Sequence, residues 1–319
     1  MTVNQRYNCR HRNRRRSYFF KGLFKTILCV AGCLTAVAAV LAVSRWFFSQ
    51  MADSVLSTEA AAASYKDGGS GNSTFKDSKG ASGSLDSGGE NWKEYKTELE
   101  AMAKTNPKVE QVIENREVYP DELFKLLALN EETVDFILDY PSKKDLAPAN
   151  TIGEVTRGQI PLLLQWDERW GYASYGGELM ALSGCGPTCL AMVAAGLTGN
   201  AAVTPYEVAR YAEQNGFYVA GEGSSWTLMS EGGAAFGVTG RELPLSENMV
   251  MDCLLQGQPV ICSMRPGDFT TTGHFIVLVG VKDGQIQVND PNSRERSEKL
   301  WDWSTLEYQI TNLWAFSKN

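Results

Sequence analysis

The stretch SGCGPTCLAM, residues 183–192, places two cysteines four positions apart around a Gly-Pro step. Pro187 is tolerated in the first turn of a helix, and the apolar residues after it predict a helix with Cys185 at its beginning. The free amide groups and the dipole of a helix N-terminus stabilise a thiolate. Gly184 and Gly186 are predicted to permit a close approach of neighbouring segments. The pattern therefore indicates that Cys185 is a nucleophile with a lowered pKa.

Other roles for the two cysteines fit the pattern less well. Cys189, one turn further along the same helix, is predicted to be a small buried apolar side chain. A redox dithiol is disfavoured because such sites have two residues between the cysteines, not three. A zinc site is disfavoured because His274 is the only histidine beyond the N-terminal head. We therefore expect no cofactor and no metal ion.

His274 is the candidate for the proton shuttle that a cysteine nucleophile needs. It begins a predicted strand, HFIVLVGV, after the flexible segment TTTG, and Asp290 ends the next predicted strand, QIQVND. Asp290 can therefore orient the imidazole. Because Asp290 precedes Pro291, a simple role in forming a turn stays open as the alternative.

The turn between these two strands decides whether His274 and Asp290 meet. We predict a three-residue loop over residues 282–284, with Gly284 in the left-handed conformation. Ile276 then lies opposite Asp290, and His274 shares the face of Asp290 two residues along. A two-residue turn without a compensating bulge would place His274 and Asp290 on opposite faces of the sheet.

The segment from about Gln159 onward changes its hydrophobic period part-way along. Helical patterns come first, as in TPYEVARYAEQNG and LSENMVMDCLLQG, and short β-branched runs such as QPVICSM follow. Helices followed by an antiparallel sheet predict an α+β domain, with the site where its two halves meet. Trp226 and Phe236 are predicted to lie in the core of this domain.

Four motifs occur in a fixed order in this segment: IPLLLQWDERWG, SGCGPTCLAMV, GHFIVLVGV and VNDPN. As a set, over about residues 158–319, they resemble family thirty-nine of the cysteine peptidases. These are the bacterial papain-like double-glycine leader peptidases, here in the stand-alone branch that lacks a transporter. The resemblance implies a papain-like fold with Cys185 as nucleophile, His274 as base, Asp290 as orienting residue and Gln165 as an oxyanion-hole side chain.

The resemblance leaves the substrate open. Family members fused to transporters cut after Gly-Gly in leader peptides, and that specificity does not carry over to a chain that shows no transporter domain. We expect a peptide or protein substrate outside the cell, with the peptide stems of the cell wall as the alternative. A surface module that holds a peptide without cleaving it is the alternative from another functional class.

Charge is distributed unevenly along the 319 residues. Nine of the 30 basic residues lie before residue 46 and no acidic residue does, so the remainder carries 21 basic against 37 acidic residues within a net charge of −7. Nucleic acid is not an expected partner of so acidic a remainder, because phosphate binding needs a basic surface.

An uncharged run, residues 26–44, follows the basic head. At about 1.5 Å rise per residue it approaches the roughly 30 Å of the hydrocarbon layer. We predict a cytoplasmic tail over residues 1–25 and an uncleaved signal anchor over residues 26–48, which places everything that follows outside the cell. A cleaved signal peptide is the alternative.

The region between the anchor and the α+β domain has two parts. Residues 49–90, rich in Gly and Ser, are predicted to be a flexible linker. Residues 91–150 have the pattern of short amphipathic helices that form a small bundle on the following domain. Asn106 and Asn130 are predicted helix caps, and one helix is predicted to end at Pro141.

Cysteines are too few for a disulfide scaffold, since only four occur beyond the predicted tail and membrane segment. One bridge, for example between Cys253 and Cys262, stays open.

Overall fold

The computed structural model of the protein describes residues 89–319. The predicted tail and anchor, and all but the end of the predicted linker, lie outside these residues. Among the helices from residue 89 onward, none is both long enough and apolar enough to cross a membrane.

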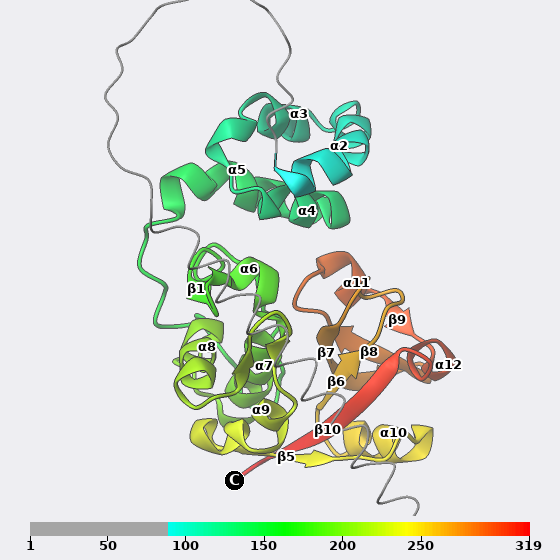
Figure 1. The fold of residues 1–319 in the computed structure, drawn as a ribbon. Helices are drawn as coiled ribbons and strands as arrows, with labels where there is room; N and C mark the ends of the chain where they lie inside the picture. The colour runs from blue at the N-terminus through cyan, green and yellow to red at the C-terminus, as the bar shows by residue number, and fades with distance from the viewer. Residues whose placement is uncertain (1–88) are drawn as a thin grey trace, which may run out of the picture. The chain divides into compact units, whose positions relative to one another are not determined.

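The first part of the described chain is a helical region (Figure 1). Its elements are α2 (Glu90–Ala103), α3 (Pro107–Glu114), η1 (Arg116–Val118), α4 (Glu122–Leu129), η2 (Glu131–Thr133) and α5 (Val134–Lys143). The two predicted caps are confirmed, because the Asn106 side chain accepts from the amide of Lys108 and the Asn130 side chain from that of Glu132.

The predicted end of a helix at Pro141 is wrong, because Pro141 lies inside α5. A proline removes its own amide donor from the helix. The neighbouring backbone bonds can persist, and the amide of Lys144 still donates to the carbonyl of Tyr140 at 3.0 Å.

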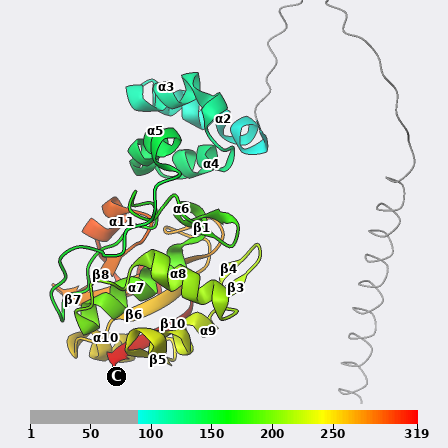
Figure 2. The ribbon, with the colours of Figure 1, turned by 90° about the vertical axis from the view of Figure 1, so that its left-hand side faces the viewer.

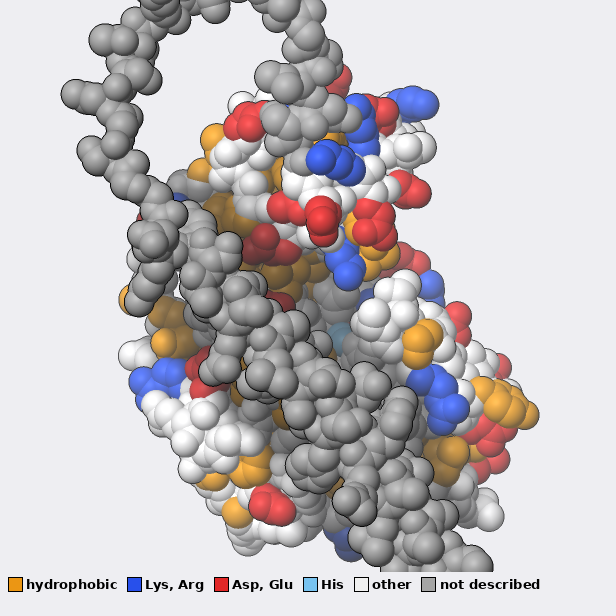
Figure 3. Space-filling view, in the orientation of Figure 1, with side chains coloured by type: hydrophobic (Ala, Val, Ile, Leu, Met, Phe, Trp, Pro, Cys, Tyr) orange, Lys and Arg blue, Asp and Glu red, His pale blue; other side chains and the backbone are white. Residues whose placement is uncertain are grey.

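The helical region shares an apolar core with the domain that follows. Leu99, Leu123 and Leu127 are fully buried together with Phe136, and they cluster with aromatic residues from beyond residue 160. The rings of Phe136 and Tyr172 stack with their centroids 4.2 Å apart. Burial of this shared surface excludes water and fixes the helical region against the domain. Figure 3 shows acidic and basic side chains interspersed on the outer surface of the helical region.

The C-terminal domain is α+β, as predicted, with its helices mostly before its strands. The helical half contains α6 (Met180–Ser183), α7 (Cys185–Thr198), α8 (Pro205–Gln214), α9 (Thr227–Ser230), η3 (Gly232–Phe236) and α10 (Glu247–Leu255). Two small hairpins accompany these helices: β1 (Ser174–Tyr175) with β2 (Glu178–Leu179), and β3 (Tyr218–Val219) with β4 (Gly223–Ser224). Figure 2 shows the β3–β4 hairpin beside α8.

The other half is a six-stranded antiparallel sheet in the order β5-β10-β6-β7-β8-β9. Its strands are β5 (Val238–Glu242), β6 (Val260–Met264), β7 (His274–Lys282), β8 (Gln285–Asn289), β9 (Leu300–Trp301) and β10 (Ile310–Lys318). Two short helices, α11 (Arg294–Glu298) and α12 (Trp303–Leu306), lie between β8 and β10.

Helix α7 packs between α8 and the sheet (Figure 1). All its residues from Gly186 to Gly196 are buried, as expected for a helix that is apolar on every side. The strands alternate between two cores: Ile261 and Val277 face α7, whereas Cys262 and Ile276 face the core that contains α10. This packing holds the N-terminus of α7 against the beginning of β7.

The turn between β7 and β8 corrects one prediction. Lys282 pairs with Gln285, so the loop has two residues, Asp283 and Gly284, both with positive φ. The predicted three-residue loop is therefore wrong. A β-bulge between Leu278 and Gly280 inserts one extra residue into β7 and restores the side-chain alternation that the shorter turn would reverse.

The bulge gives His274 and Asp290 the same relative register that a three-residue loop was predicted to give them. Beyond it, Val277 pairs with Asn289. Continuing this register places Ile276 opposite Asp290, and His274 lies on the same face as Asp290, as predicted.

Candidate active site

Cys185 is the first residue of α7 and is half-buried. The two glycines around it allow close approaches, as predicted. A Cβ on Gly184 would lie 2.5 Å from the carbonyl oxygen of Met180, and one on Gly186 would lie 2.5 Å from the hydroxyl of Ser224. Since real Cβ contacts are essentially never so short, only glycine lets β4 pack against the start of α7.

His274 begins β7 and contacts both Cys185 and Asp290. Its Nε2 lies 2.8 Å from Oδ1 of Asp290, and its side chain is hydrogen-bonded to Cys185. Because Nε2 is bonded to the carboxylate, Nδ1 is the nitrogen that faces the sulfur. Asp290 follows directly after β8 and is completely buried. The structure thus brings together three of the four site residues that the sequence predicted.

Asp290 has a second charged partner that the sequence analysis did not identify. Nε of Arg296, in α11, donates to Oδ2 of Asp290 at 2.5 Å. The amide of Asn292 donates to Oδ1 at 2.7 Å. Burial raises the pKa of Asp290, but His274 and Arg296 outweigh burial, so the pKa of this carboxyl is lowered.

The electrostatics of the site favour an ion pair between Cys185 and His274. Burial raises the pKa of the Cys185 thiol, but the hydrogen bond and charge of His274 and the amides of Phe275 and Gly186 outweigh it, and the pKa is lowered. Burial lowers the pKa of His274, but Asp290 and the Cys185 sulfur raise it to about 10. Between these two pKa values the site holds a thiolate beside an imidazolium.

Gln165 lies in the same cavity and contacts the segment before Cys185. Its Nε2 donates to the carbonyl of Ala181 at 2.7 Å and reaches the carbonyl of Leu182 at 3.4 Å. Ala181 lies four residues before Cys185, so a continuous helix would offer this carbonyl to the amide of Cys185. Instead α6 ends at Ser183, and the amide of Cys185, the first in α7, has no acceptor within that helix.

An open cleft of about 1170 Å³ contains Cys185, His274 and Gln165. Its walls come from three places: the β3–β4 hairpin, the loop before β7 and the helical region. The lining residues from these walls include Tyr218, Val219, Glu222, Ser224, Trp226, Phe269, Thr271, Asn91, Glu122, Lys125 and Leu129.

The prediction that Trp226 belongs to the core is wrong. Its side chain lines the cleft and is 46% exposed. The indole nitrogen donates to the hydroxyl of Ser263 at 3.2 Å, and the ring packs edge-on against Trp314. Hydrophobicity alone could not separate an anchored cleft aromatic from a core aromatic, because both bury apolar ring surface and differ only in how much of it. Phe236 does pack against the core as predicted.

The remaining cysteines of the described chain are buried free thiols, so no bridge joins Cys253 and Cys262. Cys189 is fully buried, and burial raises the pKa of its thiol well above the usual value, as expected for a small apolar side chain. From residue 89 onward, no group of three or more His, Cys, Asp and Glu side chains is arranged to hold a metal ion.

The sequence of the C-terminal domain is similar to that of a known protein family. The model of the Peptidase_C39 like family matches residues 158–316. The peptidase domain of Streptococcus ComA, a bifunctional ABC transporter involved in quorum sensing, is 19% identical, with 43% of this chain and 93% of that domain covered and a TM-score of 0.35. A putative C39-like peptidase from Bacillus anthracis is 16% identical, with 52% and 98% covered and a TM-score of 0.30. No curated protein matches the chain.

Proposed function

The C-terminal domain of this chain belongs to the Peptidase_C39 like family through residues 158–316, and we propose that it is an active cysteine peptidase. The observation that carries the proposal is the hydrogen-bonded series Cys185–His274–Asp290 inside an open cleft. A half-buried thiol with a lowered pKa, beside an imidazole that a buried carboxylate orients, is the arrangement that thiolate acyl transfer requires.

In this mechanism the Cys185 thiolate attacks the carbonyl carbon of a peptide bond. The developing oxyanion is stabilised by the amide of Cys185 and by Nε2 of Gln165, whose long contact with Leu182 is weak enough to be exchanged. The His274 imidazolium then protonates the leaving amine, and the C–N bond breaks to leave a thioester on Cys185. Water that gives its proton to His274 releases the peptide acid and restores the thiolate.

The same proposal places the domain outside the cell on an N-terminal membrane anchor. It is supported by the uncharged run over residues 26–44, which follows a head containing basic but no acidic residues. The substrate is then an exported or surface peptide.

Trp226 is expected to bind an apolar side chain of the substrate, because it presents an exposed ring face in the cleft that holds Cys185. We expect Trp226→Ala to raise KM about tenfold, the equivalent of ~1.4 kcal/mol of lost contact, with kcat nearly unchanged. Trp226→Phe should lie between the two. Steady-state kinetics on a cleaved peptide would measure this, with Tyr308→Ala as an exposed aromatic control outside the cleft. An unchanged KM in Trp226→Ala would contradict the assignment.

The direct test of the proposed activity is the reactivity of Cys185 toward iodoacetamide at pH 6, read by peptide mapping of the full chain. We expect rapid alkylation at Cys185, slow alkylation at the buried Cys253, and loss of the rapid reaction in His274→Ala. Reaction of Cys185 no faster than that of an ordinary thiol would favour a binding module that does not cleave its peptide.

Substrate profiling separates a peptidase that cleaves exported or surface peptides from one that cleaves the peptide stems of the cell wall. The full chain would be incubated with a peptide library and, separately, with purified cell wall, and the cleaved bonds identified by mass spectrometry. Cleavage of library peptides supports the proposal, whereas release of stem peptides from the wall alone would assign the domain to wall hydrolysis.

A further inference from the structure

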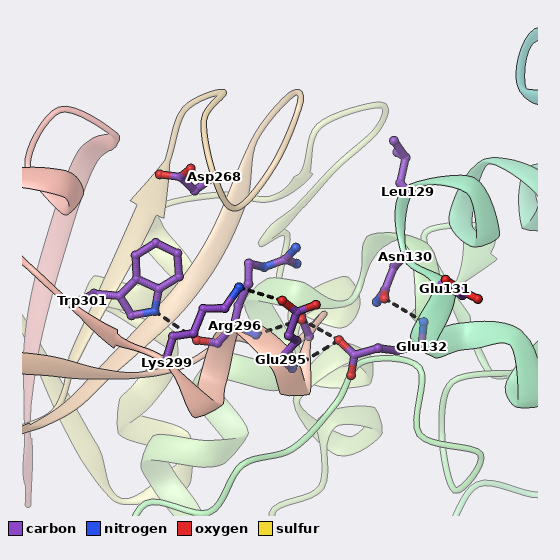
Figure 4. A pocket seen from close by; sticks show the side chains of 10 residues that line it. Leu129, Asn130, Glu131, Glu132, Asp268, Glu295, Arg296, Lys299 and Trp301 are labelled. Atoms are coloured by element: carbon purple, nitrogen blue, oxygen red, sulfur yellow. Dashed lines mark hydrogen bonds and ion pairs between the residues drawn. The ribbon is translucent and has the colours of Figure 1, made fainter. Parts of the chain in front are cut away.

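The carboxylate of Glu132, in the helical region, binds the beginning of α11 in the peptidase domain. Its Oε1 accepts from the hydroxyl of Ser293 at 2.6 Å and from the amide of Glu295 at 3.3 Å, and its Oε2 accepts from the amide of Arg294 at 2.9 Å. Figure 4 shows Glu132 directed from the helical region toward this helix end. A side chain 161 positions earlier in the chain thus supplies acceptors for the free amides of α11.

Helix α11 in turn holds Asp290. Arg296 of α11 binds Oδ2 of Asp290, and Ser297 accepts from the backbone amide of Asp290 at 2.9 Å. The Ser293 hydroxyl, which donates to Glu132, also accepts from the amide of Arg296 at 3.1 Å. Glu132 is therefore joined to Asp290, which orients His274, by hydrogen bonds through Ser293 and Arg296.

A second residue of the helical region contacts the same loop. Nδ2 of Asn130 donates to the carbonyl of Asn292 at 2.5 Å, and this carbonyl also accepts from the indole of Trp166 at 3.0 Å. Asn130 also caps Glu132, because its Oδ1 accepts from the Glu132 amide at 3.1 Å. The loop that follows Asp290 is thus fixed from both the peptidase domain and the helical region.

Apolar packing contributes little to the position of α11. None of its five residues is buried. One side of it opens onto a cavity of about 320 Å³ whose lining also includes Leu129, Asp268 and Trp301 (Figure 4). The indole of Trp301 donates to the carbonyl of Arg296 at 3.0 Å. With no buried face to fix it, α11 depends on its hydrogen bonds, and the three with Glu132 come from outside the domain.

We propose that the helical region is a positioning element for the active site, with Glu132 and Asn130 as its positioning residues. The inference rests on the proposed function. It goes beyond the family assignment, because Glu132 and Asn130 lie outside the segment that matches the family, residues 158–316. The helical region would hold α11 and Arg296 so that Asp290 keeps the imidazole of His274 directed at Cys185.

The test compares Glu132→Ala, Glu132→Gln and Glu131→Ala in the full chain. Glu131 is a matched control, because it precedes Glu132 in η2 but accepts from Asn106 instead of contacting α11. The readouts are the pH dependence of Cys185 alkylation by iodoacetamide and, on a peptide found by library profiling, kcat and KM separately. Circular dichroism at the assay temperature checks that each variant is folded.

In Glu132→Ala we expect kcat to fall about 10- to 100-fold with KM nearly unchanged, as for a small displacement of a reacting group. We also expect the alkylation of Cys185 to begin at higher pH, because a poorly oriented imidazolium stabilises the thiolate less. Glu132→Gln keeps one acceptor oxygen but places an NH2 donor at the other position, so it should recover only part of the activity. Glu131→Ala should behave as the unchanged chain.

Equal kcat and equal alkylation profiles in Glu132→Ala and Glu131→Ala would overturn the inference and leave the peptidase proposal intact. A loss in Glu132→Ala that matches the unfolded fraction would also overturn it, because the residue would then only stabilise the fold. Ordinary thiol reactivity of Cys185 in the unchanged chain would instead overturn the proposed function itself, and the inference with it.

Discussion

Replacement of Cys185 by alanine is expected to lower kcat by about 10⁶-fold, because it removes the covalent route instead of weakening it. Cys185 is half-buried at the start of α7, and alanine is smaller and suited to a helix, so the fold should be retained. The measurement is cleavage of a profiled peptide, together with binding of that peptide to the variant, which should persist.

Cys253→Ala is the matched control. Cys253 is a buried free thiol of α10, in the core on the face of the sheet opposite α7. It should retain peptidase activity. Full activity in Cys185→Ala would exclude the proposed nucleophile, and equal losses in both variants would indicate a general effect of cysteine removal.

The unchanged chain should show a bell-shaped dependence of kcat/KM on pH. The lowered pKa of Cys185 makes activity appear on the acid side of the usual thiol range, as the thiolate forms. The raised pKa of His274 makes activity decline only as pH approaches about 10, where the imidazolium loses its proton. A single rise near the ordinary pKa of a thiol would contradict the ion pair.

Asp290→Asn should produce the second largest effect, a loss of about 10⁴-fold in kcat, because an amide neither fixes the tautomer of His274 nor stabilises its positive charge. The variant should also be destabilised by about 3 kcal/mol, since Arg296 loses its carboxylate partner in a buried environment. Asp252→Asn, on the exposed side of α10 and outside the cleft, is a control that removes the same charge.

The effect of Asp290 on stability has a defined pH dependence. Its pKa is lowered in the folded protein, so its contribution to the free energy of unfolding is fully present above the ordinary aspartate range and is lost as pH falls through the folded pKa. Urea unfolding should therefore show a gap between the unchanged chain and Asp290→Asn at pH 7 that narrows at pH 3. A constant gap would show that the carboxylate charge is not the cause.

Local chemistry made much of the site predictable. A proline two residues after Cys185 and an apolar run beyond it are sufficient to place the thiol at a helix beginning, and β-branched runs are sufficient to place His274 and Asp290 on successive strands. The predicted contact between His274 and Asp290 is confirmed, although the strand register that brings them together arises in a different way. A bulge in β7 provides the extra residue that the loop was predicted to contain, and both arrangements give the same alternation of faces.

The parts that could not be predicted depend on contacts between segments far apart in the sequence. Arg296 sits in a short polar helix whose pattern gives no sign of a buried partner, and Glu132 resembles any acidic residue in the first turn of a helix. Trp226 was assigned to the core because its exposure depends on where the β3–β4 hairpin ends. Each of these roles appears only once Asp290, α11 and the helical region are placed in space.

The position of β10 within the sheet constrains when the sheet can be completed during folding. β10 lies between β5 and β6, which both precede it in the sequence. Until residues 310–318 have been made, β5 has no partner strand, and β6 is paired only on the edge that faces β7. Unpaired strand edges promote association between chains. The sheet therefore cannot close until β10 has been made, and until then the edges that β5 and β6 present to β10 are open to pairing with another chain.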